Sequence, residues 1–350
     1  MTPDPSRTRR ILVYAQDRLH ALGSKTANGL IMFRGAEVKV IVDRSKAGQT
    51  AQAVLGYGGS IPIVADIPSA LAYDPDVLAV GIAPIGGAIN PAWIPDLEMA
   101  LSKGLEVWSG LHQFVQDVPK LRSYQDQIWD VRKPPADLRV AKGTWRERRS
   151  KVLLTIGSDA NIGKMTSAMA LQKQLKDLGL ESVFIGTGQT GMMISGRGVA
   201  VDAVVSDFIN GSIEAEIDKV DGQAPLIIVE GQGAVTHMGY SGVTLGLLHG
   251  TMPDAFLLAH QPSRHTDDYG QAIPDLPYVI DLHQMLVQNF TGARVLGVNL
   301  YSKDMDLDES RSACTTIESD VGIPVEDMVR DPSERVAKAV IRELFPEHRS

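Results

Sequence analysis

The residues best suited to chemistry in this 350-residue chain form the stretch Gly157–Thr166, which reads GSDANIGKMT. It follows a short apolar run and precedes a stretch with helical periodicity, the setting in which phosphate-binding loops occur. Glycines let backbone N–H groups turn round an anion, and the N-terminus of the following helix adds a partial positive charge. Lys164 can reach the outer phosphates, and Thr166 offers a hydroxyl to a phosphate or to Mg²⁺. The stretch therefore predicts a binding site for a phosphate-bearing ligand.

The spacing within this stretch departs from the common pattern GxxxxGK[ST]. Ser158 stands where that pattern has its first glycine, and Met165 takes the usual hydroxyl position. The longer pattern present here, G-x-D-x-x-x-G-K, is similar to that of the dethiobiotin synthetase branch of phosphate-loop proteins. The residues expected to contact the ligand are Gly157, Ser158, Asp159, Asn161, Ile162, Gly163, Lys164, Met165 and Thr166.

Two later apolar runs end in residues suited to the same site. IIVEGQG, residues 227–233, ends in an acid and glycines, so Glu230 could hold Mg²⁺ or accept a proton. GVNL, residues 297–300, places Asn299 at the end of another predicted strand, where the dethiobiotin synthetase branch often uses an asparagine to read an adenine edge. A surface glutamate and an ordinary loop asparagine are the alternatives at these two positions.

The turn GTGQTG, residues 186–191, follows the second predicted strand of this half of the chain. Dethiobiotin synthetase-like enzymes carry a Lys-Pro pair at that point, whereas this turn has no lysine. It can donate backbone and hydroxyl hydrogen bonds, and we expect Gly188 to face the phosphate ligand and Thr190 to face a substrate. Because the equipment for transferring a γ-phosphoryl group is incomplete, we expect the loop to bind phosphate without cleaving it.

The segment HQPSRH, residues 260–265, follows a further apolar run. Because the carboxyl ends of parallel strands meet at one edge of a sheet, it should lie beside the phosphate loop. His260 is either a catalytic base or a structural histidine. Arg264 can clamp a carboxylate through two hydrogen bonds.

Short apolar runs alternate with helical stretches along the whole chain, which predicts an α/β fold with parallel sheets. We predict a Rossmann-like open sheet over residues 1–130, an exposed linker over 131–150, and a P-loop NTPase-like domain over 151–350. The first part has no GxGxxG dinucleotide fingerprint, although Asp43 ends its second run where an acid could bind a ribose. The expected strands are Ile11–Ala15, Val38–Asp43, Ile61–Asp66, Val77–Ala83, Leu105–Gly110, Lys151–Gly157, Ser182–Gly188, Pro225–Gly231, Ala255–His260 and Arg294–Leu300.

The composition excludes several classes of protein. Lys and Arg number 34 and Asp and Glu number 42, a net charge of −8 that argues against nucleic acid or an anionic membrane as partner. One cysteine, Cys314, excludes an internal disulfide, and eight histidines without metal-ligand spacing predict no metal site. No stretch predicts a signal peptide or a membrane span, so we expect a cytoplasmic protein. A homodimer is the expected homo-oligomer, because it is the commonest kind.

The succession of a Rossmann-like half, a linker and the motifs GSDANIGKMT, GTGQTGMMISGRG, VEGQG and HQPSRH resembles the D-glutamate N-acetyltransferase family over nearly the whole chain. The resemblance implies acetyl transfer from acetyl-CoA to the amine of D-glutamate or a related D-amino acid. It also gives the phosphate loop a role, since a P-loop can hold the phosphates of CoA without hydrolysing anything.

Acetyl transfer to an amine needs a base, donors for the oxyanion and a clamp for the substrate carboxylates. We expect Glu230 or His260 to be the base. Lys164 or the N–H groups of residues 231–233 are expected to face the oxyanion. The residues expected to bind the amino acid are Thr190, Arg197 and Arg264.

The motifs leave two other functions open. The dethiobiotin synthetase-like pattern is compatible with an ATP- and Mg²⁺-dependent ligase or kinase acting on a small carboxylate. A nucleotide-sensing module without catalysis is the third possibility.

Overall fold

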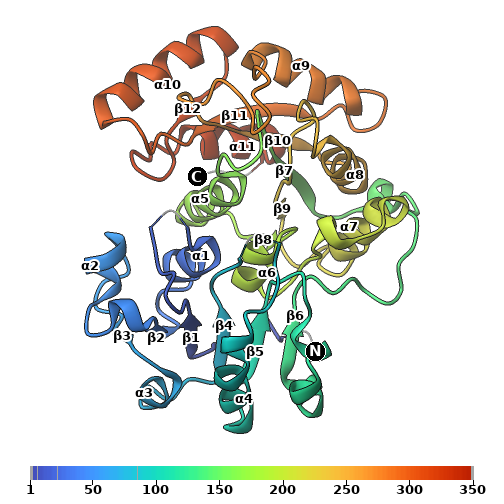
Figure 1. Cartoon of the computed structure of the whole chain (residues 1–350). Coiled ribbons are helices and arrows are strands. Elements are labelled where there is room, and N and C mark those ends of the chain that lie inside the picture. Colours follow the sequence, from blue (N-terminus) through green and yellow to red (C-terminus); the bar gives the residue numbers. More distant parts are fainter. Residues whose placement is uncertain (1–2, 6, 22, 85, 348–350) are drawn as a thin grey trace. The chain divides into compact units, whose positions relative to one another are not determined.

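The computed structural model describes residues 3–5, 7–21, 23–84 and 86–347. The chain contains two parallel six-stranded sheets with helices between the strands, so the predicted α/β class is confirmed (Figure 1). It forms two compact units, of which the first comprises Met1–Pro134 and Gln189–Ala203. The second comprises Pro135–Gly188 and Val204–Ser350.

The units are not continuous in sequence, which differs from the predicted division at residues 130 and 150. Helix α6 (Gln189–Ser195) belongs to the first unit, where it packs against α1 (Lys25–Phe33). Arg34 Nη1 donates to Met193 O at 2.9 Å. A short apolar helix has the same local pattern whichever unit it packs on, and composition therefore could not reveal this exchange.

Part of the predicted linker is also ordered by the second unit. The carboxylate of Glu214 accepts hydrogen bonds from the backbone N–H groups of Lys142, Gly143 and Thr144, at 2.6, 2.6 and 3.0 Å. Burial opposes ionisation of Glu214, but these three donors together hold its pKa below the usual value. The segment is therefore anchored to the second unit by its backbone, while the side chains of Val140, Ala141 and Lys142 are exposed.

The sheet of the first unit has the strand order β3-β2-β1-β4-β5-β6. Its connections run outward in one direction from β1 and in the other from β4, so the carboxyl ends of these two neighbours form a topological switch point. The strands are β1 (Ile11–Tyr14), β2 (Val38–Val42), β3 (Ile63–Val64), β4 (Val77–Val80), β5 (Glu106–Ser109) and β6 (Ile128–Asp130), and the remaining helices are α2 (Ala51–Leu55), α3 (Ile67–Leu71) and α4 (Ile94–Ser102).

The sheet of the second unit has the order β12-β11-β10-β7-β9-β8. Its strands are β7 (Lys151–Gly157), β8 (Ser182–Ile185), β9 (Leu226–Val229), β10 (Ala255–His260), β11 (Arg294–Leu300) and β12 (Val325–Glu326). Its helices are α5 (Lys164–Asp177), α7 (Ile209–Asp218), α8 (Ser241–Thr251), α9 (Leu276–Val287), α10 (Leu307–Val321) and α11 (Arg335–Leu344).

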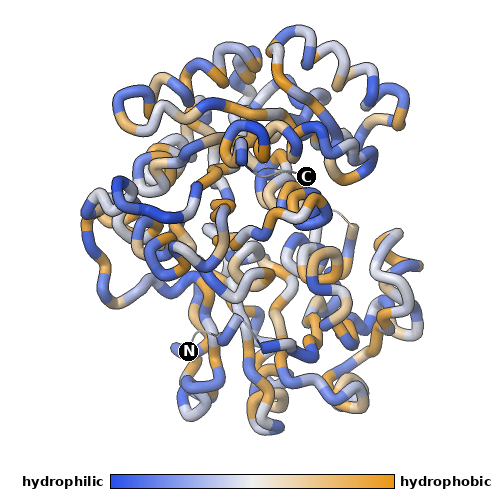
Figure 2. The backbone as a smooth tube through the Cα atoms, turned by 180° about the vertical axis from the view of Figure 1, so that it is seen from behind, coloured by the Kyte–Doolittle hydropathy of each residue, from blue (hydrophilic) through white to orange (hydrophobic). Residues whose placement is uncertain are grey.

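Helices α5 and α11 pack on the strands of the second sheet and form a buried core with them. Leu171 and Leu175 of α5 meet Leu153 and Ile228 of the strands, and Val340 of α11 joins them. Figure 2 shows hydrophobic and hydrophilic residues alternating along the helices, as expected where one side of each helix is buried. This core fixes the end of β7 and the start of α5, the two supports of the phosphate loop.

No helix in the part of the chain that the structure describes is both long enough and apolar enough to cross a bilayer.

His283 of α9 is buried in the second unit, edge-on to Phe256. Its Nδ1 bonds to Val279 O at 2.7 Å, and its Nε2 has no hydrogen-bond partner among the described residues. Burial lowers the pKa of His283 to about 4, against the bond to Val279, which raises it. The His283 imidazole is therefore harder to protonate in the folded protein than in the unfolded chain.

Acid should consequently destabilise the protein through His283. Between the unfolded pKa of about 6.5 and the folded pKa of about 4, the unfolded state binds the extra proton, so the free energy of unfolding falls as the pH falls. The loss amounts to at most about 3 kcal/mol and is absent above neutral pH. Urea unfolding at pH 7 and pH 4.5 measures it. His283→Leu should reduce the difference between the two pH values, whereas His112→Gln, at an exposed histidine, should leave it unchanged.

Candidate active site

The phosphate loop connects the end of β7, Gly157, to the start of α5, Lys164. Asn161 and Gly163 adopt left-handed backbone conformations, with φ of 57° and 92°. A Cβ on Gly157 would lie 3.0 Å from the Ile162 side chain and 3.1 Å from Lys164 Nζ, so this glycine lets the loop close tightly. The turn aims the N-terminus of a 14-residue helix at the loop, which favours an anion there.

Lys164 is buried, and its Nζ donates to Asp159 O at 2.7 Å. The ammonium group therefore lies within the loop rather than in solvent. Met165, at the usual hydroxyl position, packs on the hydrophobic core. Thr166 is half-buried in the first turn of α5 and stays a predicted ligand.

Asp159 is a buried carboxylate in the middle of the loop, only 1% exposed. Arg264 Nε donates to its Oδ2 at 2.5 Å, and Arg264 Nη2 donates to Asp268 Oδ1 at 2.7 Å. Burial works against the charge on Arg264, but these two carboxylates outweigh it and raise the pKa of the guanidinium. The sequence predicts Arg264 as a clamp for a substrate carboxylate. The structure instead directs two of its donor atoms to carboxylates of the protein, and the substrate role stays a prediction.

His237 lies on the other side of Asp159, with its Nε2 3.9 Å from Asp159 Oδ1. Its Nδ1 accepts a hydrogen bond from the N–H of Gly239, which leaves the ring proton on Nε2, facing the carboxylate. Tyr240 stacks on the imidazole at a centroid distance of 4.6 Å, and Tyr269 meets it edge-on at 5.5 Å. His237 therefore faces Asp159 without a hydrogen bond to it, because its Nε2 has no hydrogen-bond partner among the described residues.

Sequence reasoning missed His237, Asp268 and Tyr269. The glycine-rich segment around His237 follows Glu230 and forms turns before helix α8. No spacing connects it to Asp159, because the contact depends on how separate loops fold over the same sheet edge.

His260 ends β10 and contacts the phosphate loop directly. Its Nδ1 lies 2.8 Å from Ser158 Oγ, and Ser158 N donates to Ala259 O at 3.1 Å. Burial, followed by the charge of the neighbouring His265, lowers the pKa of His260 to about 4. The imidazole is therefore neutral at pH 7 and able to accept a proton.

Glu230 joins the ends of β8 and β9. Its Oε2 accepts from the N–H groups of Thr187 and Gly188 at 2.8 and 3.0 Å, while Thr187 Oγ1 donates to Glu230 O. The next residue, Gly231, has no room for a side chain, because a Cβ would lie 1.8 Å from Thr155 O and 3.1 Å from Lys164 Cδ. Glu230 therefore holds the turn at Gly188 beside the phosphate loop.

Asn299 is buried, and both ends of its amide are used within the protein. Its Nδ2 donates to Ser167 Oγ at 2.7 Å, and its Oδ1 accepts from Met328 N at 2.8 Å. The side chain thus connects β11 to α5, and its predicted contact with adenine stays a prediction. Nearby, the ring of Tyr301 covers Gly163 at the start of α5.

Thr190 and Arg197 belong to the first unit. Thr190 Oγ1 lies 2.9 Å from Thr26 Oγ1 of α1. The carbonyl oxygen of Arg197 accepts from Ser195 Oγ at 2.8 Å. Their predicted role in substrate binding stays a prediction.

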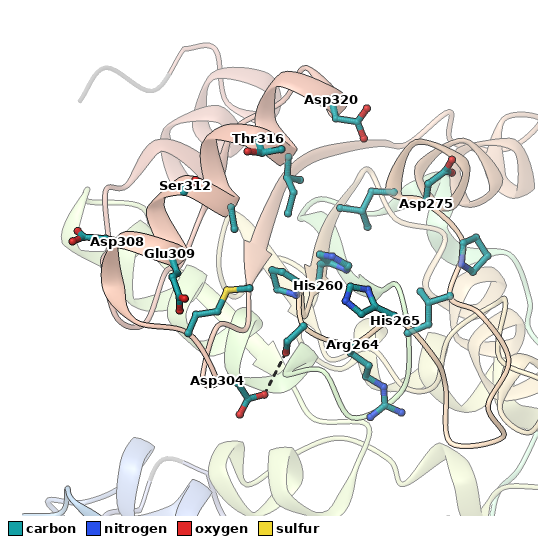
Figure 3. Close-up of a pocket in the computed structure, with 18 residues that line it drawn as sticks. His260, Arg264, His265, Asp275, Asp304, Asp308, Glu309, Ser312, Thr316 and Asp320 are labelled. Carbon is teal, nitrogen blue, oxygen red and sulfur yellow. Dashed lines mark hydrogen bonds between the residues drawn. The ribbon is translucent and has the colours of Figure 1, made fainter.

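A cavity of about 1070 Å³ opens beside His260 in the second unit. Figure 3 shows His260, His265 and Arg264 on one side of it, with polar residues of α10 on the other. Asp304 lies at its lower end, where Ser263 Oγ donates to its Oδ2 at 3.3 Å. Within the described residues, no group of three or more His, Cys, Asp or Glu is arranged to hold a metal ion. The cavity is large enough for a nucleotide-sized group next to the phosphate loop.

Comparison with known proteins agrees with this architecture. Residues 139–337 match the family described as the P-loop domain DUF1611_C, a domain of unknown function. Residues 44–134 match its Rossmann-like domain, DUF1611_N. The crystal structure of a DUF1611 family protein from Anabaena variabilis superposes with a TM-score of 0.87 at 33% identity, covering 95% of this chain and 99% of that one.

Two curated relatives carry the name D-glutamate N-acetyltransferase. The protein from Tritonibacter scottomollicae is 35% identical over 273 residues, which is 75% of this chain and 80% of the relative. The protein from a Pseudoalteromonas species is 31% identical over 265 residues, which is 72% of this chain and 77% of the relative.

Proposed function

This chain belongs to the D-glutamate N-acetyltransferase family, and from that membership we propose that it transfers the acetyl group of acetyl-CoA to the amine of D-glutamate or a related D-amino acid. That it is an acyltransferase follows from the family. The choice of acetyl donor is supported by the phosphate loop, which combines a buried lysine with a helix N-terminus. CoA carries a pyrophosphate and a 3′-phosphate, the groups that such a loop binds.

The absence of a lysine from GTGQTG supports binding without phosphoryl transfer. In its place Glu230 accepts hydrogen bonds from the backbone of Thr187 and Gly188, and the adjacent Gly231 lies against the Lys164 side chain. Because the N–H groups of Thr187 and Gly188 donate to Glu230 and that of Gly231 donates to Thr155 Oγ1, we assign the developing oxyanion to the N–H groups of residues 232–233 and to Lys164. The reaction needs no phosphate cleavage, since the bond that breaks is the thioester.

We assign the base to His260 rather than to Glu230. The imidazole of His260 is neutral at pH 7 and adjoins both the phosphate loop and the cavity. Glu230 Oε2 is already engaged by two backbone donors. In this mechanism the ammonium group of the amino acid first loses a proton, which frees the nitrogen lone pair to attack the thioester carbonyl. His260 takes the second proton of the nitrogen as the N–C bond forms, and the oxyanion then collapses, breaks the C–S bond and releases the thiolate of CoA, which takes up a proton.

A matched pair of variants tests the assignment of the base. His260→Gln should lower kcat by about a hundredfold or more, the usual contribution of a general base, while the Kd for CoA changes little. Glu230→Gln should lower kcat less than tenfold, because the glutamine oxygen can keep both backbone hydrogen bonds. In the parent, protonation of His260 should add a fall in kcat/KM as the pH approaches its pKa of about 4, and this fall should be missing from His260→Gln. A larger loss in Glu230→Gln than in His260→Gln would assign the base to Glu230.

The overall reaction is tested by incubating the protein with acetyl-CoA and a panel of D- and L-amino acids, with a thiol reagent to detect free CoA. We expect thiol release with D-glutamate and less with amino acids that lack a second carboxylate. ATP with Mg²⁺ serves as the comparison, and release of ADP is not expected. If no acidic amino acid releases the thiol, the proposed reaction is wrong.

A further inference from the structure

The first unit contains a pocket of about 350 Å³ at the carboxyl ends of β1, β2 and β4. Residues 17–20 after β1, Ser45 and Lys46 after β2, and Ile82 and Ala83 after β4 line it. This edge is the switch point between β1 and β4, where open α/β sheets bind their ligands. Its volume suits a small metabolite rather than a molecule as large as CoA.

We infer that this pocket binds a small dicarboxylate. Arg18 lines it from one loop and Lys46 from another, so positive groups line it from two sides, and His20 adds an imidazole N–H donor. Carboxylates are the groups that arginine and lysine bind best, arginine through two hydrogen bonds. Asp17 is the acid in the lining and suits the ammonium group of an amino acid, since its ion pair with Arg44 is exposed and weak.

Buried polar side chains hold the two loops in place without a ligand. Asp43 is fully buried, and its Oδ2 accepts from Leu19 N at 2.8 Å. Its Oδ1 accepts from Ser45 N at 2.8 Å and from Ser45 Oγ at 2.6 Å. Gln16, also buried, accepts from Arg44 N through its Oε1 at 2.8 Å. The pocket is therefore preformed, which lowers the entropic cost of binding.

The same contacts bear on the predicted role of Asp43 in binding a ribose. Asp43 stands where an acid would bind the ribose of a dinucleotide, but its carboxylate is buried and turned to the two loops. It builds a pocket for a smaller ligand instead.

The identity of the dicarboxylate rests on the proposed function, because D-glutamate, the acceptor named there, belongs to this chemical class. The pocket could equally bind a dicarboxylate that is not a substrate of the reaction, since both ligands carry the same two carboxylates. Glutarate, which has both carboxylates and no amine, is therefore the probe for the site itself, and D-glutamate is the probe for the acceptor.

Calorimetric titration of the full chain with glutarate tests the site. Arg18→Glu and Lys46→Glu should each weaken binding at least tenfold, because each replaces an attractive charge by a repulsive one. Lys103→Glu makes the same charge change at an exposed position before β5, at the opposite edge of the sheet, and should bind as the parent does. Arg18→Ala and Lys46→Ala repeat the test without charge reversal. A circular dichroism spectrum and a thermal unfolding midpoint like those of the parent show that the five variants are folded.

The possible results distinguish failure of the proposed dicarboxylate site from failure of the proposed acetyl transfer. A raised KM for D-glutamate in the Arg18 and Lys46 variants supports the site and shows that its occupation affects the reaction. Lost glutarate binding with an unchanged KM supports the site with a ligand that does not react. If the parent binds glutarate here and acetylates no amino acid, the site stands and the proposed function fails. If the parent binds no glutarate, or all the variants bind it as the parent does, the site is refuted whatever the activity.

Discussion

Lys164→Ala is expected to weaken the binding of CoA by tenfold to a hundredfold. The lysine is buried in the phosphate loop, with its Nζ 2.7 Å from Asp159 O, so its charge is only slightly screened by water. Hydrogen bonds to charged groups contribute roughly 1.5–3 kcal/mol, and about 1.4 kcal/mol corresponds to a factor of ten in affinity. Titration with CoA, followed by calorimetry, measures the loss.

Lys173→Ala is the matched control, because Lys173 lies on the same helix and pairs at the surface with Asp177. Its removal should leave CoA affinity unchanged. If Lys164→Ala bound CoA and ATP as tightly as the parent does, the assignment of residues 157–166 to phosphate binding would be refuted.

Arg264→Ala is expected to destabilise the second unit and to abolish tight CoA binding. The substitution leaves the carboxylate of Asp159 buried without its nearest cation. Breaking a buried ion pair in this way typically costs about 3–5 kcal/mol. An uncompensated negative charge inside the loop would also repel the phosphates it is proposed to bind. Denaturant unfolding and CoA titration measure the two effects separately.

A double variant distinguishes loss of the charge balance from loss of the arginine itself. Asp159→Asn combined with Arg264→Gln removes both charges, so it should be more stable than Arg264→Ala. Asp268→Ala removes the half-exposed partner of Arg264 and should change stability by no more than about 1 kcal/mol. Equal stability of Arg264→Ala and the parent would show that the pair contributes nothing.

The local features of the second unit could be predicted from the sequence. The strands Lys151–Gly157, Ala255–His260 and Arg294–Leu300 have the predicted bounds, because each is a long apolar run in the middle of a sheet. The phosphate loop was recognisable since its glycines, its lysine and the following helix are contiguous in sequence. The strands β6 and β12 were not predicted, because three and two residues are too few to show a periodicity.

The partners of the site residues could not be predicted in the same way. Glu230 was correctly expected at the end of a strand, but its bonds to Thr187 and Gly188 depend on β8 and β9 being neighbours. The contact of Arg264 with Asp159 requires knowledge of how the loop after β10 folds over β7. Sheet order and loop direction come from packing across the whole unit, which a local pattern does not contain.

Because Gln189–Ala203 belong to the first unit, recombination between members of the family is constrained. The chain changes units at three points, after Pro134, after Gly188 and after Ala203. A single crossover at the first of these would give a chimera in which α1 comes from one parent and α6 from the other. Arg34 would then face a foreign carbonyl at position 193, and the buried Met193 would pack on a foreign helix. Viable chimeras should therefore exchange the units with residues 189–203 carried alongside the first, which requires three crossovers rather than one.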